Sequence, residues 1–129
     1  MRIKNLAGLA VAAFFVISCN SSRVVSQDVA LFEETLRQTP NPQLVDVRTL
    51  EEYAEECLPG AINIDVKAEN FGSLIAQLDK SRPVFVYCRL GKRSMQAASV
   101  LKKNHFDVVY NLDGGINAWS AQGKPVTKP

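Results

Sequence analysis

The feature that most constrains the fold is a short apolar run, Val84-Phe85-Val86-Tyr87, which follows the helix-breaking segment Ser81-Arg82-Pro83. A strand with one solvent-exposed face alternates apolar and polar residues, whereas a strand that is buried on both faces does not. Strands of the second kind occur almost only in parallel sheets that helices cover on both sides. The run therefore predicts a central strand of a parallel sheet.

Strand and helix patterns alternate along the rest of the chain. Short apolar segments that predict further strands lie at residues 23–25, 44–47, 61–64 and 108–110. Apolar spacing or start signals predict helices over 27–38, after Thr49, across 71–78, over 94–103 and after Gly114-Gly115. We expect Ser26 to cap the first helix, and Thr49 to form a capping box with Glu52. This alternation predicts one α/β domain with helices on both faces of its sheet.

The first 18 residues have the pattern of a signal peptide rather than of a folded segment. Arg2 and Lys4 precede an uncharged apolar stretch over 6–17, which is too short to span a bilayer. The stretch ends in Val16-Ile17-Ser18-Cys19, which resembles the lipobox of bacterial lipoproteins. That resemblance implies cleavage before Cys19, a lipid on its thiol, a tether over 19–23 and a domain over 24–129. We therefore expect an exported protein that is lipid-anchored to a bacterial membrane and faces the periplasm. An ordinary secretory signal with an incidental Cys19 is the alternative.

The charge and composition of the remaining chain exclude several functions. Without Arg2 and Lys4 the chain has 13 basic and 13 acidic residues, so its formal charge is zero and no nucleic-acid partner is expected. One histidine, His105, cannot supply a multi-histidine metal site, and the spacing of three cysteines is not that of a zinc site. We expect no metal and no cofactor.

The loop that follows the apolar run has the residues of a reactive-thiol site. It reads Cys88-Arg89-Leu90-Gly91-Lys92-Arg93-Ser94, with three cationic side chains within five residues of the thiol. Ligands in open parallel sheets bind beyond the carboxyl ends of the strands, where this loop begins. Cations, and the free N–H groups at the start of the next helix, favour a thiolate over a thiol. Cys88 is therefore the candidate nucleophile.

Several motifs together resemble those of the rhodanese (thiosulfate sulfurtransferase) family, across about residues 24–126. They are Asp46-Val47-Arg48, Glu52-Tyr53, Pro59-Gly60-Ala61-Ile62-Asn63-Ile64, the Cys88 loop, Asn111-Leu112-Asp113-Gly114-Gly115-Ile116 and Ala118-Trp119. The resemblance implies a five-stranded parallel sheet with helices on both sides. It also implies that Cys88 carries sulfur as a persulfide and that Arg89, Leu90, Gly91, Lys92, Arg93 and Ser94 form the substrate-binding loop. The implied partners are a small anionic donor such as thiosulfate and an acceptor such as cyanide or a thiol.

The resemblance leaves some alternatives open. Phosphatase-like relatives have a loop one residue longer than the six residues from Cys88 to Arg93, which favours sulfur transfer. A sulfur-carrying or partner-docking module with little turnover is a second interpretation. Asp46 and Arg48 could line the pocket, although such a pair more often braces loops through hydrogen bonds.

Cys57 stands where family members commonly have a histidine. It is either a small, partly buried replacement or a resolving thiol for Cys88. We expect no Cys57–Cys88 disulfide, because Cys57 is predicted to lie about one strand length away and a disulfide requires Cα atoms within about 7 Å.

Overall fold

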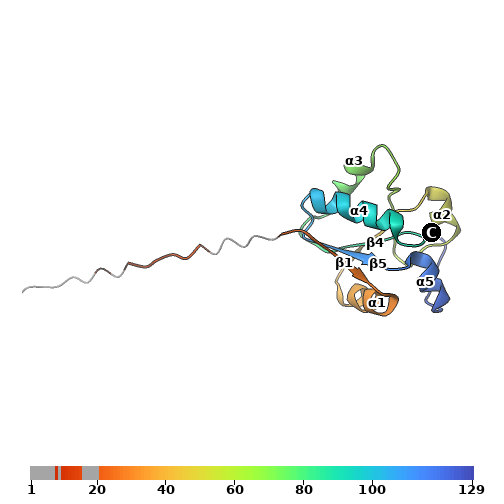
Figure 1. The fold of residues 1–129 in the computed structure, drawn as a ribbon, viewed down its shortest axis with the longest axis horizontal. Coiled ribbons are helices and arrows are strands. Elements are labelled where there is room, and N and C mark those ends of the chain that lie inside the picture. The colour runs from red at the N-terminus through yellow and green to blue at the C-terminus, as the bar shows by residue number, and fades with distance from the viewer. Residues whose placement is uncertain (1–7, 9, 16–20) are drawn as a thin grey trace, which may run out of the picture.

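The computed structural model describes residues 8, 10–15 and 21–129 (Figure 1). Cys19 and most of the predicted signal peptide lie outside these residues, so the lipidation site stays a prediction. Among the described residues, no helix has both the length and the apolar character needed to cross a bilayer.

The domain is a five-stranded parallel sheet with helices on both faces, which confirms the predicted fold class. The sheet has the order β1-β5-β4-β2-β3, and all of its strand pairs are parallel. The strands are β1 (Arg23–Gln27), β2 (Gln43–Asp46), β3 (Ile62–Asn63), β4 (Val84–Tyr87) and β5 (Val108–Leu112). The helices are α1 (Val29–Gln38), α2 (Leu50–Glu55), α3 (Phe71–Ile75), α4 (Lys92–Lys103) and α5 (Gly115–Ala121).

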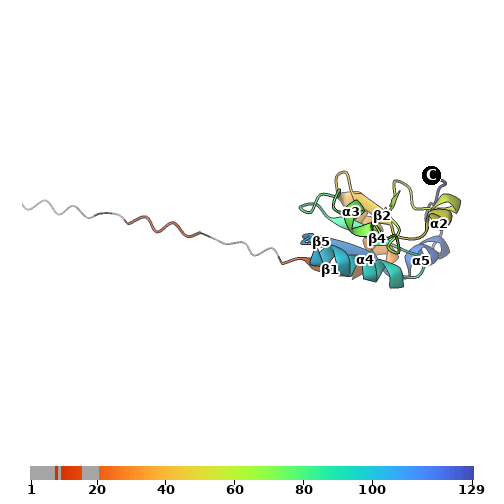
Figure 2. The same cartoon turned by 90° about the horizontal axis from the view of Figure 1, so that it is seen from above.

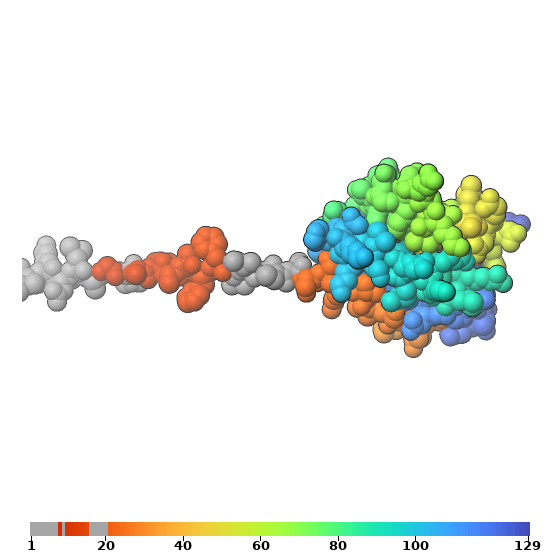
Figure 3. All heavy atoms as spheres, turned by 45° about the horizontal axis from the view of Figure 1, so that its top comes forward, coloured from red at the N-terminus to blue at the C-terminus, as the bar shows by residue number. Residues whose placement is uncertain are grey.

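Strand β4 lies in the middle of the sheet and all four of its residues are buried. Its side chains alternate between two apolar cores. Val84 and Val86 pack with α3 and α4, whereas Phe85 and Tyr87 pack with α1 and α5. Figure 1 shows α3 and α4 on one face of the sheet and α1 on the other. Figure 2 looks onto the face that α3 and α4 cover, and Figure 3 shows these two segments on the surface of the molecule. Because helices cover both faces of the sheet at β4, every side chain of this strand is buried, which explains its uninterrupted apolar sequence.

The start of the domain differs from the sequence prediction. Residues 26 and 27 extend β1 instead of beginning a helix, because the chain pairs with β5 as far as Gln27 and Leu112. Helix α1 begins at Val29 and is capped by Asp28, whose carboxylate accepts a hydrogen bond from the Leu31 N–H at 2.9 Å. Ser26 is therefore not the cap.

Other boundaries also moved. Helix α3 ends at Ile75 rather than at residue 78, and β2 spans Gln43–Asp46 rather than 44–47. Helix α4 begins at Lys92, two residues earlier than predicted, because Gly91 has a φ of 116° and turns the chain directly into the helix. Strand β5 continues to Leu112, and β3 is only the two residues Ile62–Asn63. The predicted capping box of α2 is confirmed, with the Glu52 N–H donating to Thr49 Oγ1 at 3.2 Å.

Candidate active site

The Cys88 loop occupies the carboxyl edge of the sheet, between the end of β4 and the start of α4. Cys88 follows the last residue of β4, and Gly91 is the N-cap of α4. The left-handed backbone of Gly91 lets its N–H point back at Cys88, to which it donates a hydrogen bond with an N–Sγ distance of 3.0 Å. The loop therefore curls around the sulfur atom.

The sulfur of Cys88 lies among hydrogen-bond donors. Burial raises the pKa of Cys88, but a hydrogen bond with the Ser94 hydroxyl and hydrogen bonds from the backbone N–H groups of Ser94, Gly91 and Leu90 outweigh it, so that the pKa is lowered. Ser94 is fully buried, and its Oγ lies 3.4 Å from Cys88 Sγ. The loop amides and one hydroxyl are therefore the main groups that stabilise the thiolate.

The three loop cations have different surroundings. Arg93 makes a two-pronged ion pair with Glu52, with Nη1–Oε1 and Nη2–Oε2 distances of 2.7 and 3.0 Å. This pair lowers the pKa of Glu52 to about 2 and raises that of Arg93. Arg89 and Lys92 have exposed side chains. Arg93 is thus held beside the loop by a carboxylate, while Arg89 and Lys92 remain available to an anion.

A cavity of about 350 Å³ opens over the thiol, and we call it the sulfur cavity. It is lined by Lys67, Cys88, Arg89, Leu90, Lys92, Arg93 and Gln96. Cys88 itself is only 1% exposed, so a reagent must enter this cavity to reach it. Sequence reasoning missed Lys67 and Gln96. Gln96 lies one helical turn after Lys92, so helical periodicity could have indicated it, whereas Lys67 is in a distant loop with no local signal.

Asp46 and Arg48 form a buried brace beside the loop. The Arg48 guanidinium donates to both Asp46 carboxylate oxygens, with Nη2–Oδ2 at 2.7 Å, and also to the Glu56 carbonyl. The Tyr87 hydroxyl donates to Asp46 Oδ2 at 2.7 Å and accepts from the Leu58 N–H at 3.0 Å. The group ties the ends of β2 and β4 to the segment that follows α2. Neither Asp46 nor Arg48 lines the sulfur cavity.

Helix α5 supports the loop from behind. The N–H groups of Ile116 and Asn117 donate to the carbonyls of Cys88 and Arg89, at 2.9 and 3.2 Å. Gly115, with a φ of 58°, permits this approach, since a Cβ there would lie 2.5 Å from the Arg89 and Cys88 carbonyl oxygens. With its carbonyls bound by α5, the loop keeps its own N–H groups for the sulfur side.

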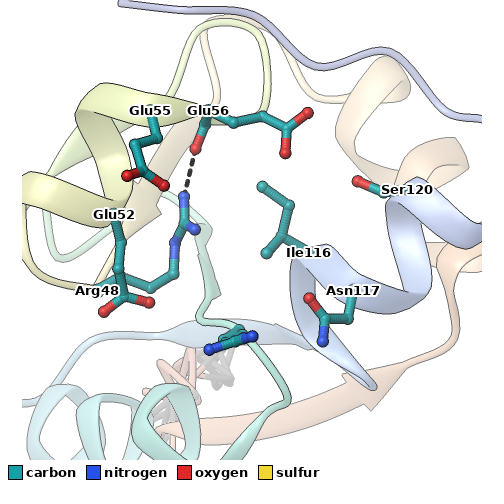
Figure 4. Close-up of a pocket in the computed structure, with 8 residues that line it drawn as sticks. Arg48, Glu52, Glu55, Glu56, Ile116, Asn117 and Ser120 are labelled. Atoms are coloured by element: carbon teal, nitrogen blue, oxygen red, sulfur yellow. Dashed lines mark hydrogen bonds between the residues drawn. The ribbon is translucent and has the colours of Figure 1, made fainter.

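A second cavity, of about 520 Å³, lies between α2 and α5, and we call it the α2–α5 cleft (Figure 4). Glu52, Glu55 and Glu56 line it on the α2 side, and Ile116, Asn117 and Ser120 on the α5 side. Arg48 and Arg89 complete the lining. Arg89 thus borders both cavities.

Cys57 lies in the interior, away from the sulfur cavity. It is 2% exposed and bridges the C-terminal segment through backbone hydrogen bonds with Thr127, at 2.8 and 2.9 Å. Burial raises the pKa of the Cys57 thiol. Cys57 and Cys88 are both free thiols in the structure. Within the described residues, no cluster of three or more His, Cys, Asp or Glu side chains could hold a metal ion.

Comparison with known proteins finds a matching domain family, relatives in sequence and similar solved structures. The profile of the Rhodanese-like domain matches residues 15–122. A "Sulfurtransferase" of Allochromatium vinosum is 34% identical over 102 residues, which cover 79% of this chain and 94% of that protein. The "Thiosulfate sulfurtransferase GlpE" of Shewanella oneidensis is 37% identical, over 65% of this chain and 81% of that protein. The solved rhodanese-like domain of the Alr3790 protein from Anabaena sp. superposes with a TM-score of 0.70 at 27% identity, covering 81% of this chain and 79% of that one.

Proposed function

Because this chain belongs to the rhodanese-like domain family and its relatives include sulfurtransferases, we propose that it transfers sulfane sulfur through a persulfide on Cys88. The observation that carries the proposal is the Cys88 thiol itself. It is buried, yet hydrogen bonds from Ser94 and from the loop N–H groups lower its pKa. A thiolate held ready in this way is a nucleophile that needs no separate general base.

The first half-reaction uses an anionic donor, with thiosulfate as the model. The Cys88 thiolate attacks the sulfane sulfur, a new S–S bond forms, and the S–S bond of thiosulfate breaks. Sulfite leaves with the electron pair, and Cys88 holds one additional sulfur. In the second half-reaction, a thiolate or cyanide attacks that outer sulfur and Cys88 departs as a thiolate. The hydrogen bonds that lower the pKa of Cys88 also make it a better leaving group.

The sulfur cavity suits a small anionic donor. Arg89, Lys92 and Lys67 bring exposed positive charges to its lining. Arg93 adds a fourth, but its guanidinium is already engaged with Glu52. We propose that Arg89, Lys92 and Lys67 bind the sulfonate end of the donor, and that Arg93 with Glu52 fixes the wall of the cavity.

The decisive experiment is intact-mass spectrometry of the soluble domain after incubation with thiosulfate. We expect the mass of one added sulfur atom in the wild type, its loss on treatment with cyanide, and no addition to Cys88→Ser. A thiosulfate-to-cyanide turnover assay then separates an enzyme from a carrier. Stable loading with no turnover above that of Cys88→Ser would favour the carrier, and failure to load would refute the proposal.

We also propose that the chain is exported and anchored to a bacterial membrane through a lipid on Cys19. The support is the lipobox-like sequence that ends at Cys19. Metabolic labelling with a fatty-acid analogue should label the wild type and not Cys19→Ala. Equal labelling of both forms would refute the anchor.

A further inference from the structure

The α2–α5 cleft is larger than the sulfur cavity, and Arg89 is the one lining residue that the two cavities share. We propose that it binds the acceptor, and that the acceptor is a small thiol carrying both a carboxylate and an ammonium group. This inference rests on the proposed function, because it names the class of molecule that removes sulfur from Cys88.

A buried guanidinium with a free nitrogen lines the cleft. The Arg48 side chain is only 7% exposed, and its Nε and Nη2 are bound to Asp46 and Glu56. Its Nη1 has no hydrogen-bond partner among the described residues, and Arg48 lines the cleft. Figure 4 shows this guanidinium directed into the space between α2 and α5. Asp46 already balances the charge of Arg48, so Arg48 offers its free N–H groups and Arg89 brings the positive charge to the lining. These groups suit a carboxylate.

Negative charge lies on the α2 side of the same cleft. Glu55 and Glu56 are exposed and line the cleft, and neither forms an ion pair in the described part of the chain. Glu52 lines the same wall, but Arg93 already neutralises it. Two free carboxylates suit an ammonium group. Because the cleft carries both arginine and glutamate side chains, a ligand with a single charged group would leave either the arginines or the glutamates without a partner.

The cleft adjoins the cavity that contains the thiol. Arg89 borders both cavities, and the Glu52–Arg93 ion pair joins the wall of one to the wall of the other. A peptide-sized molecule held by its charged ends in the cleft can therefore extend its thiol past Arg89 into the sulfur cavity. Asn117 and Ser120 on α5 offer hydrogen bonds along the cleft.

The transfer step balances without another reagent. The acceptor thiol loses its proton to solvent and its thiolate attacks the outer sulfur of the Cys88 persulfide. An S–S bond forms on the acceptor, the S–S bond to Cys88 breaks, and Cys88 leaves as a thiolate. The product is a persulfide of the small thiol. No net oxidation or reduction takes place, because one sulfur atom moves from thiol to thiol.

Acceptor kinetics on sulfur-loaded protein test the assignment. Glutathione, which carries both charges, should be used with a KM at least tenfold below those of cysteamine, N-acetylcysteine and 2-mercaptoethanol. Glu55→Gln with Glu56→Gln should raise the KM for glutathione about tenfold, and leave that for cyanide and the loading by thiosulfate unchanged. Glu51→Gln is the matched control, because Glu51 lies exposed on α2 and does not line the cleft. Equal KM values for all four thiols, or a variant indistinguishable from the control, would overturn the inference.

A binding measurement separates this inference from the proposed function. S-methylglutathione cannot accept sulfur, so its titration into unloaded Cys88→Ser, followed by NMR shifts, reports the cleft alone. Shifts at Asn117 and Ser120 that the Glu55→Gln, Glu56→Gln pair abolishes would support the site, even if Cys88 failed to load. Absence of binding at millimolar concentration would refute the site, even if Cys88 loaded normally.

Discussion

Replacement of Ser94 by alanine tests the origin of the Cys88 thiolate. The Ser94 hydroxyl donates to the Gly91 carbonyl at 3.0 Å while its oxygen lies 3.4 Å from Cys88 Sγ, and it can rotate to donate to a thiolate. A hydrogen bond to a charged group contributes about 1.5–3 kcal/mol. Because the Gly91 N–H stays in place at 3.0 Å, we take the lower end of this range. A loss of about 1.4 kcal/mol lowers the thiolate fraction about tenfold at any pH below the pKa.

The assay is the rate of alkylation of Cys88 by iodoacetamide as a function of pH. A thiolate of higher pKa is also more nucleophilic, with a Brønsted coefficient of about 0.4–0.5. The Ser94→Ala variant should therefore react about threefold more slowly on the acid side, reach half-maximal rate at higher pH, and react about threefold faster at its alkaline plateau. Ser99→Ala, on the same helix with its hydroxyl donating to the Met95 carbonyl, is the control. Coincident profiles for Ser94→Ala and wild type would refute the reasoning.

Three further predictions concern the groups around the loop. Lys92→Ala should raise the KM for thiosulfate several-fold, because it removes an exposed cation from the sulfur cavity. Lys102→Ala, at the far end of α4, should leave this KM unchanged, and equal KM values for the two variants would show that Lys92 does not bind the donor. Glu52→Gln should lower the free energy of unfolding at pH 7 by about 1–2 kcal/mol, after allowance for partial exposure. The Glu52 pKa is depressed to about 2 in the folded state, chiefly by Arg93, so this stability is present at neutral pH and is lost as pH falls from about 5 to 2. Urea titrations across that range should show the gap between wild type and variant closing, and a constant gap would contradict the ion-pair argument. Gly115→Ala should destabilise the domain by about 1–3 kcal/mol and slow the alkylation of Cys88, because the added Cβ would clash with the carbonyls of Cys88 and Arg89. Gly123→Ala, with a φ of 70° and open space around it, is the control for backbone strain alone, and equal losses would show that the contact is unimportant.

The sequence predicted the sheet and its central strand because these depend on local patterns. An unbroken apolar run such as Val84-Phe85-Val86-Tyr87 fits only a strand buried on both faces. The boundary of β1 could not be predicted in the same way. Ser26 and Asp28 are both good N-caps, and the choice between them depends on the pairing of Gln27 with Leu112, a contact across 85 positions.

The candidate site shows the same division between local and distant information. Cys88 and its loop are contiguous, so their residue types alone indicated a thiolate site. The partners of the loop are distant in sequence. Glu52 reaches Arg93 across 41 positions, Gly115 lies against the Arg89 carbonyl, and Lys67 enters the cavity from another connection. From the sequence, the same substrate-binding role was predicted for all three loop cations. The fold shows that Arg93 differs from the other two, because it is paired with the Glu52 carboxylate.

These contacts separate the carbonyl groups of the loop, which face α5, from its N–H groups, which face the sulfur. Helix α5 binds the carbonyls of Cys88 and Arg89, while the N–H groups of Leu90, Gly91 and Ser94 turn to the sulfur. A loop with its carbonyls unsatisfied could rotate its peptides and present oxygen lone pairs to the sulfur, which would repel a thiolate. The thiolate therefore depends on a helix that does not touch it, and Gly115 allows that helix to come close enough. This is why a methyl group at position 115 should alter the reactivity of Cys88 as well as the stability of the domain.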